Sequence, residues 1–511
     1  MDLSDLKMRR KVVAWLGFGL GVGAFFLLLP ARGAAFSIQY SAGLSVLTML
    51  CFRWLTNPVH PGIFGFLSPH GIVLVNSFVY FGLGPLPRLA FPEALVIGYF
   101  NPGADEHYLP ALLLCLAGLL VFDLVYRWAV RSFALDRALE ARMEGFFSPA
   151  MQEFIPRAAF FWYLLCLGVF GYMTRSFVMH SFGFAGVEGA IENIFLQGGP
   201  WLLGTAWIMQ SLLLVRPGPR RFSPKLILLL FILLLPVMLA YENRRIIIYC
   251  LIISFAVYYL YPRRTIGLKA VAWGFFLILG GFFLMTSAKH LTRTDPSLRR
   301  HISEERNIFR RARLIVSTPE FFDLEPVDIL LRQSMVVRFN GLDWPAALME
   351  AHYRSGVSFL GGRHNLEAAT IVVPKVLWPG KPPMAVADTV NRNFELARFD
   401  QLVTVLGSSY ADWGMFGVLL GFGFLGVFFP LALRLILVRR DGLIVYLASL
   451  LPLMSFESYL MRYILIWLRW VVIIMALNSV LALVWHWFLL RKRGMEGAAE
   501  IGSLPPEMAN K

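Results

Sequence analysis

Paired arginines beside long apolar runs are the residues of this sequence that most clearly suggest chemistry. Arg244 and Arg245 stand in "YENRRIIIY", between two such runs. A guanidinium near the centre of a bilayer costs roughly 2.5 to 3.5 kcal/mol on insertion scales, so the pair requires an anion or access to the headgroups. Arginine binds phosphate oxygens in a bidentate manner, which makes both residues candidates for phosphate binding. The alternative is a turn between two helices from which both side chains extend to the headgroups.

Three further arginines are candidates for anion or sugar binding. Arg338 stands in "VVRFNG" and Arg363 in "GGRHN", and the alternative for each is a surface ion pair. Arg469 follows Arg462 by seven residues, close to two helical turns, so both lie on one face of a predicted membrane helix. Their candidate ion-pair partners are Asp123 and Glu457.

A general base is predicted in the same part of the chain as Arg363. His364 is the first candidate, because an unperturbed imidazole titrates near pH ~6.5. The two preceding glycines, Gly361 and Gly362, permit backbone conformations that are closed to other residues. Asp412 and Tyr410 in "SSYADWG" are the alternative candidates. Asp412 could equally cap the helix that follows it.

Sequence motifs for metal or nucleotide chemistry are missing. The sequence contains no DxD, GxxxxGK[ST], HExxH, CxxC or GxSxG motif. These motifs mark nucleotide-sugar, P-loop, zinc-protease and serine-hydrolase sites, so we predict neither a metal site nor a cofactor. The four cysteines lie in apolar runs without paired spacing, and we predict that they are packing residues.

The elements that must position these residues are membrane helices. Of the 511 residues 58% are hydrophobic and only 15% are charged, and the mean hydropathy is +0.64, which excludes a soluble domain. An apolar segment of about 17 to 25 residues is long enough to cross a bilayer. We therefore predict an all-α polytopic membrane protein with about twelve transmembrane helices. These lie near residues 12–31, 34–55, 70–90, 109–130, 157–175, 195–215, 225–241, 246–261, 269–287, 414–437, 443–458 and 463–489.

The basic residues set the predicted orientation. If the amino terminus is cytoplasmic, the cytoplasmic segments hold twenty-three Lys and Arg, and the short outer turns hold six. This bias follows the positive-inside rule and predicts that both termini are cytoplasmic. The net charge of +15 is therefore mostly a consequence of topology, and we do not expect nucleic acid to be a partner.

The predicted domain organisation places one long extracytoplasmic loop between two groups of membrane helices. In chain order the parts are nine helices, the loop, three helices and a cytoplasmic tail, at residues 1–287, 288–413, 414–490 and 491–511. Within the loop, "PVDILLRQSMVVRFNGLDWPAALMEAHYR" predicts two helices, the second with Asp343 as its N-cap and Pro345 in its first turn. "LEAATIVVPKVLWPGKPP" predicts a short interfacial helix that ends at Pro374.

Several of these segments resemble one known family. "RFNGLD" followed by a glycine that ends a short helix, then "VVPKVLWPGKP", then "SSYADWGMFGV" entering a new span, are similar to segments of Wzy-type O-antigen polymerases. The arginine in "ENRR", at the top of a mid-chain span, fits the same pattern. The resemblance covers roughly residues 225–440.

The resemblance implies a GT-C-like, metal-independent, inverting glycosyltransferase in the bacterial inner membrane that takes part in lipopolysaccharide biosynthesis. It would move a growing glycan from undecaprenyl pyrophosphate onto another lipid-linked repeat unit, and membrane lipids and a chain-length regulator protein would be further candidate partners. Arg244 and Arg245 would stabilise the leaving pyrophosphate, and Arg338 and Arg363 would contact a second phosphate or a sugar. A base would accept the proton of the attacking hydroxyl.

Two other functions remain open from the sequence. A flippase or transporter of a lipid-linked anionic glycan would also have about twelve spans and charged cavity residues, although it would usually show internal repeats. A ligase that moves finished polymer onto lipid A core would share the donor and the arginines. The single large outer loop favours chemistry at one face over transport.

Overall fold

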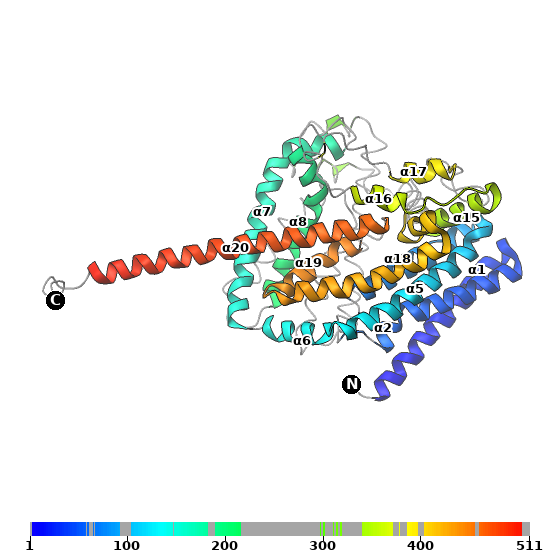
Figure 1. Ribbon diagram of the computed structural model, residues 1–511, viewed down its shortest axis with the longest axis horizontal. Coiled ribbons are helices and arrows are strands. Elements are labelled where there is room, and N and C mark those ends of the chain that lie inside the picture. The colour runs from blue at the N-terminus through cyan, green and yellow to red at the C-terminus, as the bar shows by residue number, and fades with distance from the viewer. Residues whose placement is uncertain are drawn as a thin grey trace.

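The computed structural model shows a helical protein (Figure 1), and its described part contains α-, 3-10 and π-helices but no strand. The structure describes residues 3–57, 59–60, 65, 67–91, 104–146, 148–181, 190–215, 297, 300–301, 310, 313–314, 317–318, 340–370, 378, 386–396, 403–454 and 459–502. The predicted all-α class is thus confirmed for the described residues.

The described helices fall into two groups along the chain. The first group is α1 (Leu3–Cys51), α2 (Arg53–Thr56), α3 (Pro69–Ser77), the π-helix η2 (Phe78–Leu83), α4 (Leu86–Ala90), the 3-10 helix η4 (Ala104–His107), α5 (Tyr108–Ser132), α6 (Leu135–Phe146), α7 (Pro149–Ser181) and α8 (Ala190–Val215). The second group is α15 (Asp343–Ser355), α16 (Arg363–Ala369), α17 (Val386–Asn393), α18 (Val405–Val438), α19 (Gly442–Met454) and α20 (Leu460–Gly502).

Five described helical segments are long and apolar enough to cross a membrane, which makes this a multi-pass membrane protein. They are Met8–Cys51, Pro69–Ala90, Ala104–Ser132, Val405–Val438 and Leu460–Trp487. Two shorter apolar segments, Trp201–Leu213 and Gly442–Met454, fall where spans 195–215 and 443–458 are predicted. The predicted spans 225–241, 246–261 and 269–287 lie outside the described residues, so the total of about twelve stays a prediction.

Helix α1 contains two predicted spans that pack on each other. Gly33 has a φ of 74° and interrupts the helix. A Cβ on Gly17 would lie 3.1 Å from the carbonyl oxygen of Ser45, and one on Gly21 would lie 3.1 Å from that of Ser41. The two halves therefore run antiparallel, in agreement with separate spans at 12–31 and 34–55. Small residues allow this close approach of two backbones.

Helices α5 and α18 form the centre of the bundle and run in the same direction (Figure 1). A Cβ on Gly118 would lie 2.8 Å from Phe422, and one on Gly426 would lie 3.0 Å from Val125, so glycines on each helix receive side chains from the other. Both helices start at the end of the bundle that carries α15, α16 and α17. We call this the loop end, and the end where α5 and α18 finish the opposite end.

Helix α18 begins nine residues before the predicted span 414–437. The Thr404 side chain accepts a hydrogen bond from the Gly407 backbone N–H at 3.2 Å and caps the helix. The helix is then interrupted at Trp413 and at Gly414, which has a φ of 62°. The predicted boundary between loop and span therefore coincides with this kink and not with the start of the helix.

Candidate functional site

Asp412 ties the loop segment around residues 360–365 to the start of α18. Its carboxylate accepts backbone N–H bonds from His364 and Asn365, both at 3.1 Å, and a further bond from the Asn365 side-chain amide. The backbone adds two bonds, from Leu360 N–H to the Ala411 carbonyl at 3.0 Å and from Gly361 N–H to the Asp412 carbonyl at 2.9 Å. Asp412 thus caps α16, a helix 47 and 48 residues away from it, instead of the span that follows it.

The glycine pair before α16 has the role that the sequence predicted. Gly361 and Gly362 have φ values of 59° and 91°, which favour glycine over other residues. A Cβ on Gly362 would also lie 2.6 Å from the Trp413 ring. The pair therefore permits both the turn and the close contact between α16 and the kink of α18.

His364 is buried, with no exposed surface, and its ring meets Tyr459 edge-on at a centroid distance of 4.5 Å. Neither ring nitrogen has a hydrogen-bond partner within the described structure. Burial lowers the pKa of His364 to about 3, so the imidazole is neutral near pH 7. It can then offer one N–H donor and one nitrogen acceptor to a ligand.

The lowered pKa of His364 predicts that acid destabilises the protein. An unfolded histidine titrates near 6.5, so between pH 6.5 and 3 the unfolded chain binds a proton that the folded chain does not. Above pH 6.5 the imidazole is neutral in both states and its protonation does not affect stability. As the pH falls below 6.5, the free energy of unfolding decreases, by about 2 kcal/mol at pH 5. Between pH 7.5 and pH 5 we expect the melting temperature of the His364→Gln variant to decrease less than that of the wild-type protein. An equal loss in both proteins would show that His364 is accessible to protons in the folded state.

Asp343 joins the loop to α5 and does not act as an N-cap. The Asn340 amide donates to the Tyr108 hydroxyl at 2.7 Å, which in turn donates to the Asp343 carboxylate at 2.9 Å. The residue at the N-cap position of α15 is Leu342, and no side chain caps this helix end. The predicted N-cap role is therefore wrong, because the carboxylate is used for a contact between helices. Pro345 does lie in the first turn of α15, as predicted.

Tyr410 lies in the same cluster, buried to 2% exposure, with its ring edge-on to Phe359 at 5.5 Å. The Arg363 side chain is exposed and forms an ion pair with Glu367 at 2.9 Å, which is the alternative that the sequence left open. Arg469 is half-buried on α20, and Arg462 is exposed. The other arginines predicted to bind anions, Arg244, Arg245 and Arg338, lie outside the described residues.

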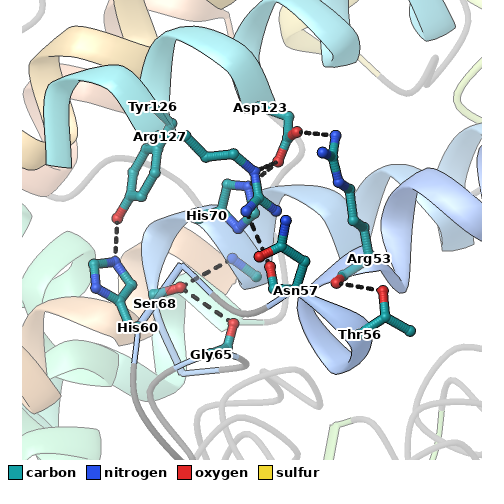
Figure 2. A network of polar contacts seen from close by, with 11 residues as sticks. Arg53, Thr56, Asn57, His60, Gly65, Ser68, His70, Asp123, Tyr126 and Arg127 are labelled. Carbon is teal, nitrogen blue, oxygen red and sulfur yellow. Dashed lines mark hydrogen bonds and ion pairs between the residues drawn. The ribbon is translucent and has the colours of Figure 1, made fainter. Parts of the chain in front are cut away.

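A second polar cluster lies among the membrane helices (Figure 2). Asp123 and Arg127 belong to the second half of α5, which places the cluster toward the opposite end of the bundle. The fully buried Asp123 carboxylate accepts from His70 Nε2 at 2.7 Å, from Arg127 Nε at 2.8 Å and from Arg53 Nη1 at 2.9 Å. The imidazole of His70 stacks on Phe122 at 5.7 Å. Asp123 is therefore already engaged, and it is not the partner of Arg462 or Arg469. These two arginines are no part of its described contacts.

A histidine pair with a tyrosine borders this cluster. His60 is buried and binds the Asp136 carboxylate through Nδ1 at 2.9 Å and the Tyr126 hydroxyl through Nε2 at 3.0 Å. The Tyr126 ring also contacts His70, at a centroid distance of 4.9 Å. These contacts hold His60 against Tyr126 of α5 (Figure 2) and against Asp136 of α6.

The sequence reasoning missed Arg53, His70 and Arg127 as parts of a cluster. One signal was present, since Asp123 and Arg127 are four residues apart within an apolar span and must share a helix face. Ionisable residues at that depth mark functional sites by default. The contributions of Arg53 and His70 come from other helices and could be found only from the packed structure.

Comparison with family models, curated proteins and solved structures finds no match to this chain. Among the described residues, no group of three or more His, Cys, Asp or Glu side chains is arranged to hold a metal ion.

Proposed function

We propose that this protein is a glycosyltransferase that polymerises undecaprenyl-pyrophosphate-linked oligosaccharide repeat units, at the outer face of the bacterial inner membrane. The observation that supports this proposal is the convergence of the described family-like segments at the loop end. Asn340 and Asp343 of the family-like "RFNGLD" meet Tyr108 there. Asp412 of the family-like "SSYADWG" binds "GGRHN", the loop segment that holds the candidate base and is not part of the family pattern. The Trp344 ring lies against Gly407 so closely that a Cβ at this position would clash with it.

A glycine that ends a short helix is one part of the sequence pattern that resembles the family. Gly356 terminates α15 in the left-handed conformation, with a φ of 63°. It turns the chain back toward Phe359 and the start of α18, since a Cβ on Gly414 would lie 2.7 Å from the Phe359 ring. With the chain turned back in this way, His364 on α16 lies at the loop end of the bundle.

The proposed chemistry requires no nucleotide, because the sugar to pyrophosphate bond already stores the free energy of transfer. The hydroxyl of an acceptor sugar attacks the donor sugar, its proton passes to a base, and the pyrophosphate leaves with the bonding electron pair. His364 is the proposed base, and Asp412 positions it by holding the backbone of α16. A buried imidazole with a pKa of about 3 is a weak base, but it is neutral near pH 7 and therefore in the form that accepts a proton.

The topology of the proposal follows the charge distribution. With about twelve spans and both termini in the cytoplasm, the loop end faces outward, where a lipid-linked donor presents its pyrophosphate. Arg244 and Arg245 are the proposed ligands of this group, with Arg338 and Arg469 as further candidates for anion or sugar binding.

The lipid-linked glycans of cells that lack this protein provide the test. Polymerase function predicts that single repeat units accumulate on the undecaprenyl carrier. Full-length polymer retained on the carrier would instead indicate a ligase. Repeat units that fail to reach the outer leaflet would indicate a flippase, and unchanged glycans would exclude all three functions.

Arg→Lys substitution tests the proposed pyrophosphate ligands. Lysine retains the charge but loses the bidentate fork, so at the liganding position, which we expect to be Arg245, Lys should be nearly as harmful as Ala. Loss of one charge-assisted hydrogen-bonded contact predicts a rate lower by about 10- to 100-fold. Polymer amount and length are measured at equal protein level, with Arg264→Lys as the control on the predicted cytoplasmic side. Normal polymer with Lys at both positions would identify the two arginines as headgroup anchors.

A further inference from the structure

Two arginines at the opposite end of the bundle share a single carboxylate. Arg53 and Arg127 come from different helices, α2 and α5, and both donate to Asp123, to Oδ2 at 2.9 Å and to Oδ1 at 2.8 Å (Figure 2). His70 Nε2 donates to Oδ1 as well, at 2.7 Å, so the orientation of the carboxylate is set from three sides. The two guanidinium groups are thus held close together by one buried anion.

The charges of this arrangement are not balanced locally. One carboxylate cannot neutralise two guanidinium groups, and Asp136, a carboxylate at the border of the cluster, is bonded to His60. Arg131 lies one turn beyond Arg127 on the same face of α5 and is exposed, which adds a further positive charge toward the surface. The site therefore has a net positive charge and would be completed by an anion.

Several N–H groups of the two arginines are available to such an anion. Arg53 uses only Nη1 in the described structure, and Arg127 uses Nε for Asp123 and Nη1 for the Asn57 carbonyl at 3.0 Å. Arg127 Nη2 is buried and has no partner within the described residues. A buried guanidinium nitrogen without an acceptor is costly, about 1 to 3 kcal/mol or more for a charged group, so an oxygen-rich ligand is expected there.

The position of the arginines points to the headgroup region of a membrane. Arg53 lies two residues after Cys51, where a candidate span ends, and Arg127 lies five residues before the end of the span that finishes at Ser132. The Arg53 side chain is 38% exposed, so the site is reachable from the surface, whereas Asp123 is fully buried below it. Basic sites between membrane helices at this depth bind anionic lipid headgroups.

We propose that Arg53 and Arg127, oriented by Asp123 and His70, bind the phosphate group of an anionic membrane lipid at the opposite end of the bundle. The guanidinium forks bind phosphate oxygens in a bidentate manner, and Asp123 and His70 act as positioning residues. The phosphate belongs either to a bilayer phospholipid or to a polyprenyl phosphate. This site is separate from the proposed polymerase site and does not depend on that function.

Lipid binding to the purified full-length protein, measured by native mass spectrometry, tests this proposal. The probes are phosphatidylglycerol, undecaprenyl phosphate and, as the zwitterionic reference, phosphatidylcholine. We expect at least one anionic lipid to bind about tenfold or more tightly than phosphatidylcholine, and Arg53→Ala to reduce that affinity about tenfold or more. Arg440→Ala, which removes an exposed charge at the same end of the bundle, is the matched control and should change the affinity less than about twofold.

Arg53→Lys covers the case in which Arg53→Ala does not fold. It retains the charge but not the fork, and we expect a comparable loss of affinity. Binding of both anionic lipids would indicate general recognition of phosphate headgroups, and binding of undecaprenyl phosphate alone would identify the polyprenyl carrier as the ligand. Equal binding of all three lipids, or wild-type binding by the folded Arg53 variant, would overturn the proposal.

Discussion

Asp412→Ala is expected to abolish polymer formation and to lower the stability of the protein. The substitution leaves the backbone N–H groups of His364 and Asn365 without their buried acceptor. Loss of the helix cap and of these hydrogen bonds predicts a destabilisation of about 2 to 4 kcal/mol. Because the same bonds place α16 on α18, His364 would lose its position together with the cap. Polymer length in cells and the melting temperature of the purified protein are the two measurements.

Glu367→Ala is the matched control for Asp412→Ala, since it removes a carboxylate that belongs to α16 itself and makes an ion pair within that helix. Glu367 forms an ion pair with the exposed Arg363, so its loss should change stability by less than about 1 kcal/mol. If Asp412→Ala retained both the melting temperature and the polymer of wild type, Asp412 would be neither the cap nor the positioning residue that its contacts indicate.

His364→Ala is expected to lower the turnover number by about 10²- to 10⁴-fold if its imidazole accepts the proton of the attacking hydroxyl. The Michaelis constant for the acceptor should change much less, because a base contributes mainly to the transition state. The measurement is the initial rate of chain extension by the purified protein, with lipid-linked repeat units as donor and acceptor. Glutamine at the same position retains hydrogen bonding but cannot act as a base at neutral pH, so His364→Gln should be as slow as the alanine variant.

His352→Ala provides the comparison for a structural histidine. His352 lies on α15, is bonded to the Val357 carbonyl at 2.7 Å and stacks on Phe359 at 4.3 Å, so its loss should affect stability more than turnover. Near-normal rates in His364→Gln would remove the base role from His364. Asp412 would then be the next candidate for the general base in this cluster.

Local features of the loop could be predicted well from the sequence. The Gly361 and Gly362 pair, the end of α15 at Gly356 and the place of Pro345 in a first turn depend on φ preferences of single residues. Such preferences act within a few residues along the chain and need no knowledge of neighbouring helices. The same holds for the described apolar spans, because length and hydrophobicity alone decide whether a helix can cross a bilayer.

The partners of the acidic residues could not be predicted in the same way. Asp343 and Asp412 were both considered as caps of the helices next to them in sequence. In the structure Asp343 bonds to Tyr108, 235 residues away, and Asp412 caps α16. A buried carboxylate needs several donors, and whichever helix packs against it supplies them.

By itself, the sequence determined that this protein is helical and crosses a membrane, and where its described spans and glycine turns lie. Only the tertiary structure decided that His364 is buried beside Tyr459 and that Asp123 holds Arg53, Arg127 and His70. The physical reason is the range of the interactions. Hydrophobicity and backbone preference are properties of short segments. The burial and hydrogen bonding of Asp123 instead depend on Arg53, which is 70 positions away in the sequence, and on His70, which is 53 positions away, and both meet Asp123 only when the helices pack.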